Sequence, residues 1–149
     1  MTDRKMELIR AEDEGWAQLC SILEGLSPSA LETTRVTDDW TAKDMLGHLA
    51  CWWAEAACVL ERIRMGTHEP EKLDLDQMNA RFFDAMRDVD LHTIRAELAA
   101  SRNRALEELG RLEGLPPAAH EWFYETGPCH YDEHLRDLRR AVEPASPAP

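Results

Sequence analysis

Apolar residues recur along the chain at the three- and four-residue spacing of amphipathic helices, and this pattern predicts four long helices. They are expected over about 4–26, 42–65, 91–112 and 128–142. A shorter helix is predicted over about 75–89, between the second and third long ones. The sequence has no run of alternating apolar and polar residues that would indicate a strand. We therefore expect an all-α protein, a four-helix bundle with one short extra helix.

The start of the second long helix carries the clearest local signal in the sequence. Thr41 is placed to cap the helix, and Asp44 three residues later completes a capping box. Trp40 before the cap is expected to pack on Met45. Gly66 is expected to end the helix. The capping role of Asp44 competes with any role in proton transfer, and we favour capping.

The remaining segments predict breaks between the helices. Residues 114–126 are expected to form a break and a loop, and Pro128 to occupy the first position of the last helix. The tail 143–149 is rich in Pro and Ala and is predicted to be disordered. The pattern therefore predicts one helical domain over residues 1–142.

Three histidines are the strongest candidates for chemistry. His130 and His134 are four residues apart, so a helix places both imidazoles on one face, and His48 lies at the edge of an apolar stripe. Two ligands from one helix and one from another would form a three-nitrogen metal site with open positions. Taken singly, each feature has a simpler explanation, because a partly buried histidine is often a structural hydrogen-bonding residue. The other histidines, His68, His92 and His120, are expected at the surface.

The charge of the chain makes some partners unfavourable. Lys and Arg total 17 against 29 Asp and Glu, which gives a formal charge of −12. Phosphate backbones and anionic lipids repel such a chain, so we expect neither a nucleic-acid nor a membrane partner. The four cysteines form no C-x-x-C pair, and the sequence shows no signal peptide or membrane-spanning run. A reducing cytoplasm is the expected compartment.

Three segments of the chain resemble motifs of a known family. Residues 40–49, WTAKDMLGHL, resemble a helix start, and residues 129–139, CHYDEHLRDLR, resemble a closing helix of the DinB-like four-helix bundle superfamily. Residues 76–80, DQMNA, resemble a middle element of the same proteins. The superfamily includes mycothiol-dependent maleylpyruvate isomerases, bacillithiol transferases and the ClbS/DfsB group. The resemblance is specific in the second and last helices and extends loosely from the first helix to about residue 140.

This resemblance implies a DinB-type bundle with a long crossover between its second and third main helices. It also implies a homodimer and a divalent metal, zinc, nickel or iron, held by His48, His130 and His134. Two residues depart from the pattern. Trp53 stands where an acidic residue is frequent, which would make the pocket mouth more apolar. Cys129 replaces a small polar residue and could serve as a fourth soft ligand, although we assign it to packing.

The function implied is a metal-dependent enzyme acting on a small molecule, a transferase or isomerase that uses a low-molecular-weight thiol. A divalent ion would lower the pKa of a thiol or water and so produce a nucleophile at neutral pH. Trp52, Trp53 and Trp122 are the candidate walls of a substrate pocket, and Tyr124 and Glu125 are candidates for positioning or proton transfer. The alternatives are a non-catalytic stress-response protein that sequesters a small ligand or metal, and a structural bundle that binds no metal.

Overall fold

The computed structural model describes residues 2–143, and over this range the chain is helical without a named strand. The prediction of an all-α protein is therefore confirmed. No described helix is both long and apolar enough to cross a membrane. In chain order the elements are α1 (Asp3–Glu24), α2 (Pro28–Thr33), α3 (Ala42–Met65), α4 (Leu75–Met86), α5 (Leu91–Arg111), α6 (Pro117–Tyr124), the π turn η1 (Glu125–Cys129) and α7 (His130–Val142).

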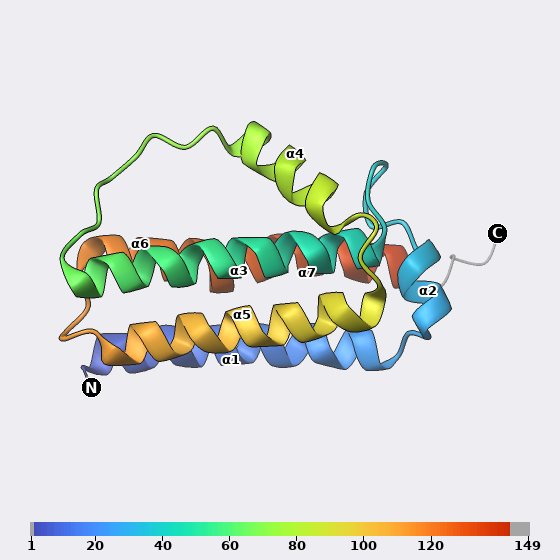
Figure 1. Ribbon diagram of the computed structural model, residues 1–149. Helices are drawn as coiled ribbons and strands as arrows, with labels where there is room; N and C mark the ends of the chain where they lie inside the picture. Colours follow the sequence, from blue (N-terminus) through green and yellow to red (C-terminus); the bar gives the residue numbers. More distant parts are fainter. Residues whose placement is uncertain (1, 144–149) are drawn as a thin grey trace.

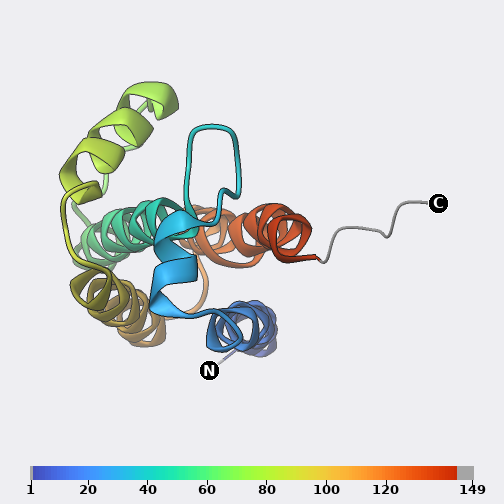
Figure 2. The same cartoon turned by 90° about the vertical axis from the view of Figure 1, so that its right-hand side faces the viewer.

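Four long bodies make up the bundle: α1, α3, α5 and the continuous rod of α6, η1 and α7 (Figure 1). Helices α3 and α5 run in the same direction, so the chain must cross the length of the bundle between them. Residues 66–74 and α4 form this crossover, and α4 lies on the outside of the bundle (Figure 2). The predicted crossover and short extra helix are therefore both present.

Helix α3 lies at the centre of the bundle, and its ends have the signals predicted from the sequence. The side chain of Thr41 accepts a hydrogen bond from the backbone of Asp44, and the carboxylate of Asp44 accepts one from the backbone of Thr41. Gly66 ends the helix with φ 72°, in the left-handed region that glycine enters without steric cost. This capping box fixes the start of the helix that carries His48.

Helix α5 packs along α3 through the apolar stripe that the sequence predicted. The six residues of this stripe are all buried: Leu91, Ile94, Leu98, Ala105, Leu109 and Leu112. Their three- and four-residue spacing keeps them on one face of the helix. The opposite face carries charged residues, so the pattern alone determines which side of α5 enters the core.

The sequence prediction was wrong between α5 and α7. The expected loop over 114–126 contains helix α6, which continues through η1 into α7. Pro128 lies inside the π turn and not at the first position of a helix. A proline within an α-helix removes a backbone hydrogen bond and clashes with the preceding turn, whereas the wider π turn accommodates it. The short helix α2 was also missed, and residues 144–149 of the predicted disordered tail lie outside the described residues.

A buried polar network joins α1, α3, α5 and α7. The carboxylate of Glu12 is fully buried and accepts hydrogen bonds from Arg102 at 2.6 Å and from the Tyr131 hydroxyl at 2.8 Å. The Tyr131 hydroxyl in turn accepts one from the Trp53 indole at 2.9 Å. The Arg102 guanidinium also lies over the Trp16 ring, 4.5 Å from its centroid. Burial, followed by the nearby Glu12 carboxylate, raises the pKa of Tyr131, which keeps its hydroxyl proton in place.

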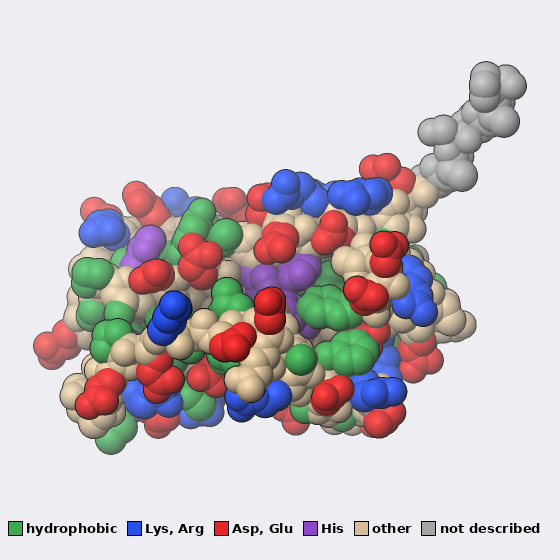
Figure 3. Space-filling view, turned by 90° about the horizontal axis from the view of Figure 1, so that it is seen from above, with side chains coloured by type: hydrophobic (Ala, Val, Ile, Leu, Met, Phe, Trp, Pro, Cys, Tyr) green, Lys and Arg blue, Asp and Glu red, His purple; other side chains and the backbone are tan. Residues whose placement is uncertain are grey.

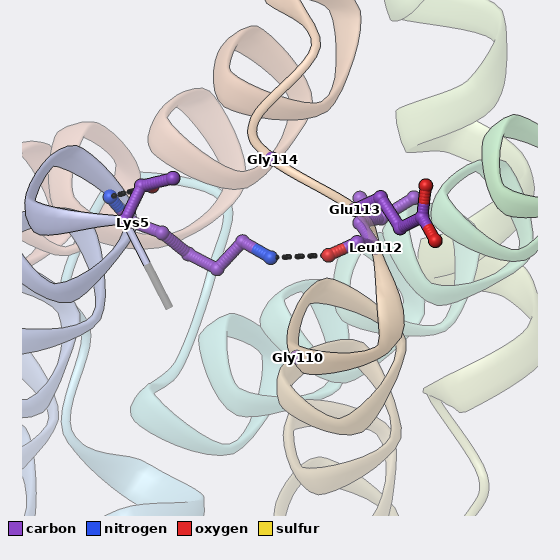
Figure 4. Close-up of a pocket in the computed structure, with 6 residues that line it drawn as sticks. Lys5, Gly110, Leu112, Glu113 and Gly114 are labelled. Carbon is purple, nitrogen blue, oxygen red and sulfur yellow. Dashed lines mark hydrogen bonds between the residues drawn. The ribbon is translucent and has the colours of Figure 1, made fainter.

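A second polar contact joins the ends of α1 and α5. Lys5 is almost completely buried, and its ammonium group donates a hydrogen bond of 2.6 Å to the backbone carbonyl of Leu112 (Figure 4). Leu112 is the C-cap of α5. Carbonyl groups at the C-terminal end of a helix carry partial negative charge, so a lysine is a favourable partner there. We assign Lys5 to holding the two helices together.

Candidate metal centre

Three histidines from two helices converge on one point inside the bundle. His48 comes from the second turn of α3, and His130 and His134 come from the first two turns of α7. The Nε2 atoms of His48 and His130 are 2.8 Å apart, and one ring nitrogen from each of the three residues lies within 4.8 Å of the others. We call these residues the histidine triad. The structure thus brings together the three residues that the sequence singled out.

Two nitrogens of the histidine triad have no hydrogen-bond partner in the described structure. They are Nδ1 of His48 and Nε2 of His134, both buried. A buried polar atom without a partner costs about 1–3 kcal/mol, so native proteins seldom retain one without a use for it. Imidazole nitrogens suit zinc, nickel and iron. The donor set therefore fits a divalent transition metal.

The surroundings of the histidine triad keep its rings neutral. Burial, reinforced by His134, lowers the pKa of His48 to about 3. Burial and the two neighbouring rings lower the pKa of His130 to about 2, and a hydrogen bond to the Thr126 backbone acts in the opposite direction. Burial also lowers the pKa of His134. Neutral imidazoles keep the lone pairs that a metal ligand requires.

The ring of Trp40 lies beside two members of the histidine triad. Its ring centroid is 4.5 Å from that of His48 and 6.2 Å from that of His134. The sequence assigned Trp40 only to packing beside the helix cap. Because Trp40 precedes the first residue of α3, helical spacing could not place it beside either histidine.

A cavity of about 1060 Å³ extends from the histidine triad along α3 and α6. Trp40, Trp52 and Trp122 line it, and the ring centroids of Trp52 and Trp122 are 6.4 Å apart. The Trp52 indole donates a hydrogen bond of 2.8 Å to the side chain of Asn79 on α4, which fixes the orientation of its ring. The crossover helix therefore helps to shape the aromatic wall.

Two residues named from the sequence as substrate-binding candidates, Trp53 and Tyr124, lie outside this cavity. Trp53 is fully buried in the core and donates its indole N–H to Tyr131. Neighbouring residues on a helix point about 100° apart, and here Trp52 faces the cavity while Trp53 faces the core. Tyr124 is 43% exposed and stacks on His120, with ring centroids 5.9 Å apart. Neither Trp53 nor Tyr124 is among the residues that line the cavity.

Acidic side chains dominate the charge of the cavity lining. Figure 3 shows histidines at the centre of this face with Asp and Glu side chains gathered around them. Among the described residues, the lining includes one arginine, Arg62, and also His68, which was expected at the surface. It includes eight carboxylates: Asp39, Glu55, Glu69, Glu71, Glu121, Glu125, Glu133 and Asp137.

The acidic lining of the cavity was not predicted from the sequence, although Glu125 was named as a candidate residue. A signal was present, because residues 121, 125, 133 and 137 recur at multiples of four, the spacing that also relates His130 to His134. Within residues 2–143 only Asp137 of these eight carboxylates forms an ion pair, with Arg140 at 3.6 Å. The cavity therefore presents an uncompensated negative charge.

Cys129 also lines the cavity, next to His130. Burial, followed by the nearby Glu125 carboxylate, raises the pKa of the Cys129 thiol. A thiol with a raised pKa stays protonated at neutral pH and is a poor nucleophile. The cavity therefore contains no activated cysteine among its described residues.

The protein is a helical bundle in which three histidines converge at one end of an aromatic cavity. It is therefore one of the helical bundles that have a candidate metal centre in their interior. The sequence profile of the DinB superfamily matches residues 12–128, more than half of the chain, and the protein belongs to this superfamily. The match includes His48 and ends before His130, so the three-residue cluster rests on the structure. Searches of curated proteins and of solved structures found no match.

Proposed function

We propose that the protein is a metal-dependent enzyme that transfers or isomerises a small molecule with a low-molecular-weight thiol as co-substrate. The observation that carries the proposal is the convergence of three neutral histidines, two of them buried and one half-buried, at one end of a large aromatic cavity. A divalent ion held by His48, His130 and His134 would supply Lewis acidity that lowers the pKa of a thiol or a water molecule. The cavity leaves room for a small molecule beside it.

The side chains of this protein have defined parts in the proposal. Trp40 holds the rings of His48 and His134 in place, while Trp52 and Trp122 form a wall against which the substrate lies. Of the polar candidates named from the sequence, Tyr124 does not line the cavity and Asp44 is occupied in the capping box. Glu125, which does line it, remains as the group that accepts a proton.

In a transfer reaction the thiol sulfur bonds to an electrophilic carbon of the substrate. The leaving group departs with the electrons of the broken bond, and the thiol proton passes to Glu125. The carboxylate then releases the proton to solvent. Because Cys129 has a raised pKa, the proposal takes its sulfur from a co-substrate and not from the protein.

The test begins with elemental analysis of protein purified without a tag. We expect about one divalent ion per chain, lost to background in His48→Ala and retained in the matched control His92→Ala, whose histidine is exposed on α5. The metal-loaded protein is then assayed with mycothiol, bacillithiol and glutathione against a neutral, an anionic and a cationic electrophile: 1-chloro-2,4-dinitrobenzene, maleylpyruvate and (2-bromoethyl)trimethylammonium. Activity should disappear with chelator, return with one divalent ion, and survive Cys129→Ser.

Two outcomes would contradict the proposal. If His48→Ala, His130→Ala and His134→Ala each keep stoichiometric metal, the histidine triad is not the site. If the loaded protein turns over none of these combinations yet binds a small ligand tightly, the protein is a sequestering protein. This second candidate rests on the same cavity, which serves binding as readily as catalysis.

We also propose that the protein forms a homodimer. Several large apolar side chains of the bundle are exposed, among them Met65 at 64% and Leu75 at 53%. Met and other large apolar side chains are enriched in the buried core of interfaces between subunits. Light scattering at micromolar concentration should give twice the chain mass, and a monomer mass would reject the proposal.

A further inference from the structure

The cavity carries a charge that restricts what it can bind. Its lining has eight carboxylates against one guanidinium, and seven of the eight form no ion pair within residues 2–143. Like charges in a cleft with low-dielectric walls reinforce one another and concentrate ions of the opposite sign. An anionic substrate would be repelled from this cleft, and a cationic one would be attracted.

The carboxylates closest in position to the aromatic wall come from several elements. Glu55 is half-buried on α3 and follows Trp52 by three residues, so the two side chains share a helix face. Glu121 and Glu125 flank Trp122 on α6 and η1, and all three line the cavity. A solvated acidic helix face would belong to one element, whereas these carboxylates line one cavity from both of its sides.

Aromatic faces and carboxylates attract the same kind of ligand. The face of an indole ring is negative, and it binds ammonium groups through cation–π interactions, most strongly for substituted ammonium ions that shed water easily. The hydrogen bond from Trp52 to Asn79 holds one such ring in place. A small hydrated metal ion would gain from the carboxylates but would have no use for the tryptophans.

We propose that the small molecule accepted by this cavity is an organic cation, with a substituted ammonium group placed between Trp52, Trp122 and the carboxylates of Glu55, Glu121 and Glu125. This inference rests on the proposed function for the location of the site and specifies its substrate class. His48, His130 and His134 line the same cavity, so a ligand held by the tryptophans would lie beside the histidine triad. The reacting end of the cation would then lie toward the histidine triad.

The test compares two probes of equal shape. Choline and 3,3-dimethylbutan-1-ol differ by the replacement of a charged nitrogen with a neutral carbon. Their affinities are measured by calorimetry on the full chain, once loaded with zinc and once treated with chelator. We expect choline to bind at least about fivefold more tightly, from the cation–π contribution alone. This preference should weaken as sodium chloride screens the carboxylates.

Variants separate the two parts of the recognition. Glu55→Gln should weaken choline binding several-fold and leave binding of the neutral probe unchanged. Trp122→Leu should weaken both probes, because the wall itself is lost. The matched control is Glu107→Gln, an exposed carboxylate on α5 that does not line the cavity, and it should change neither affinity.

Equal affinity for the two probes, or tighter binding of the neutral one, would overturn the inference. So would an unchanged charge preference in a Glu55→Gln/Glu121→Gln/Glu125→Gln variant whose circular dichroism matches the wild-type spectrum. Failure of the proposed function has a different signature. A protein that prefers choline but turns over no thiol and electrophile would keep this inference and lose the enzymatic one.

Discussion

The start of α7 has two faces that differ in how their buried polar groups are hydrogen-bonded. On one face, Tyr131 joins Glu12, Arg102 and Trp53 in a network whose hydrogen bonds measure 2.6–2.9 Å. On the other face, neighbouring positions of the same helix supply His130 and His134 to a cluster with unpartnered nitrogens. The two faces differ by a single residue step along one helix.

We assign the hydrogen-bonded face to the stability of the fold and the face with unpartnered nitrogens to function. A satisfied buried network rigidifies a fold and gives no opening for a ligand. An unsatisfied buried cluster lowers stability, so its presence points to a partner supplied from outside. The first face therefore fixes the position of α7, and the second face uses that position.

The largest effect that we expect is the loss of stability on acidification, which acts through the histidine triad. In metal-free protein the pKa of His48 is about 3, well below its usual value of 6.5, and the pKa values of His130 and His134 are lowered as well. The unfolded chain therefore binds protons that the folded chain cannot. The free energy of unfolding should fall as pH drops below about 6.5, by about 1.4 kcal/mol per pH unit for each of His48 and His130, and His134 should add to this fall.

Denaturant melts of chelator-treated protein between pH 7.5 and 5 measure this slope. A His134→Leu variant should show a smaller slope over the same range, because the pKa of His134 is lowered in the folded protein. A metal-free protein whose stability is constant down to pH 5 would mean that the folded histidines protonate as easily as the unfolded ones.

Removing Glu12 should disrupt the hydrogen-bonded network on the other face of α7. Glu12→Ala leaves the half-buried Arg102 without its main partner and Tyr131 without an acceptor. Breaking a buried charged pair in this way costs about 3–5 kcal/mol. The matched control is Asp13→Ala, which removes a second carboxylate 2.8 Å from Arg102 that is largely exposed. This control should cost less than about 1 kcal/mol, and equal losses in the two variants would show that the network adds nothing to stability.

Loss of the α3 cap should affect both faces equally, because α3 carries His48 and Trp53 alike. Thr41→Ala removes the side-chain acceptor for the Asp44 backbone and should destabilise the protein by about 1 kcal/mol. Denaturant melts measure this loss, with Thr33→Ala, an exposed threonine on α2, as a control of the same chemical change away from the α3 cap. A Thr41→Ala protein as stable as wild type would remove the capping argument and release Asp44 for another role.

The smallest effect that we expect is the difference in stability between two substitutions on opposite faces of α7. In metal-free protein His134→Leu replaces an unpartnered buried nitrogen with carbon of similar volume, so stability should change by less than about 1 kcal/mol or increase. Tyr131→Phe, three positions earlier, removes a satisfied hydroxyl and should cost about 1–2 kcal/mol. A loss for His134→Leu as large as that for Tyr131→Phe would mean that the two faces do not differ.

Local signals predicted the helices that depend on local physics. The apolar spacing of α5 and the Thr41–Asp44 capping box both involve residues a few positions apart, and the structure contains both. The His130–His134 pair is local in the same sense. His48 was added from its place at the edge of an apolar stripe, and the family resemblance reinforced this choice, because no spacing rule relates residues 82 positions apart.

The failures came from contacts that the sequence does not encode locally. The Glu12–Arg102 pair joins residues 90 positions apart, and nothing near either residue announces it. Trp53 was placed beside Trp52 in the pocket although one residue step turns its side chain into the core. Pro128 was interpreted by its usual role at a helix start, because proline inside a helix is normally excluded.

The π turn over Glu125–Cys129 has a consequence for the history of this chain. A π turn is an α-helix that has gained one residue, and such an insertion turns everything that follows by about 100°. Loss of one codon within this turn would convert it back to α-helix and rotate His130, Tyr131 and His134 to new directions together. A single-codon insertion or deletion can therefore assemble or remove the histidine triad in one mutational step, whereas substitutions would need several coordinated steps.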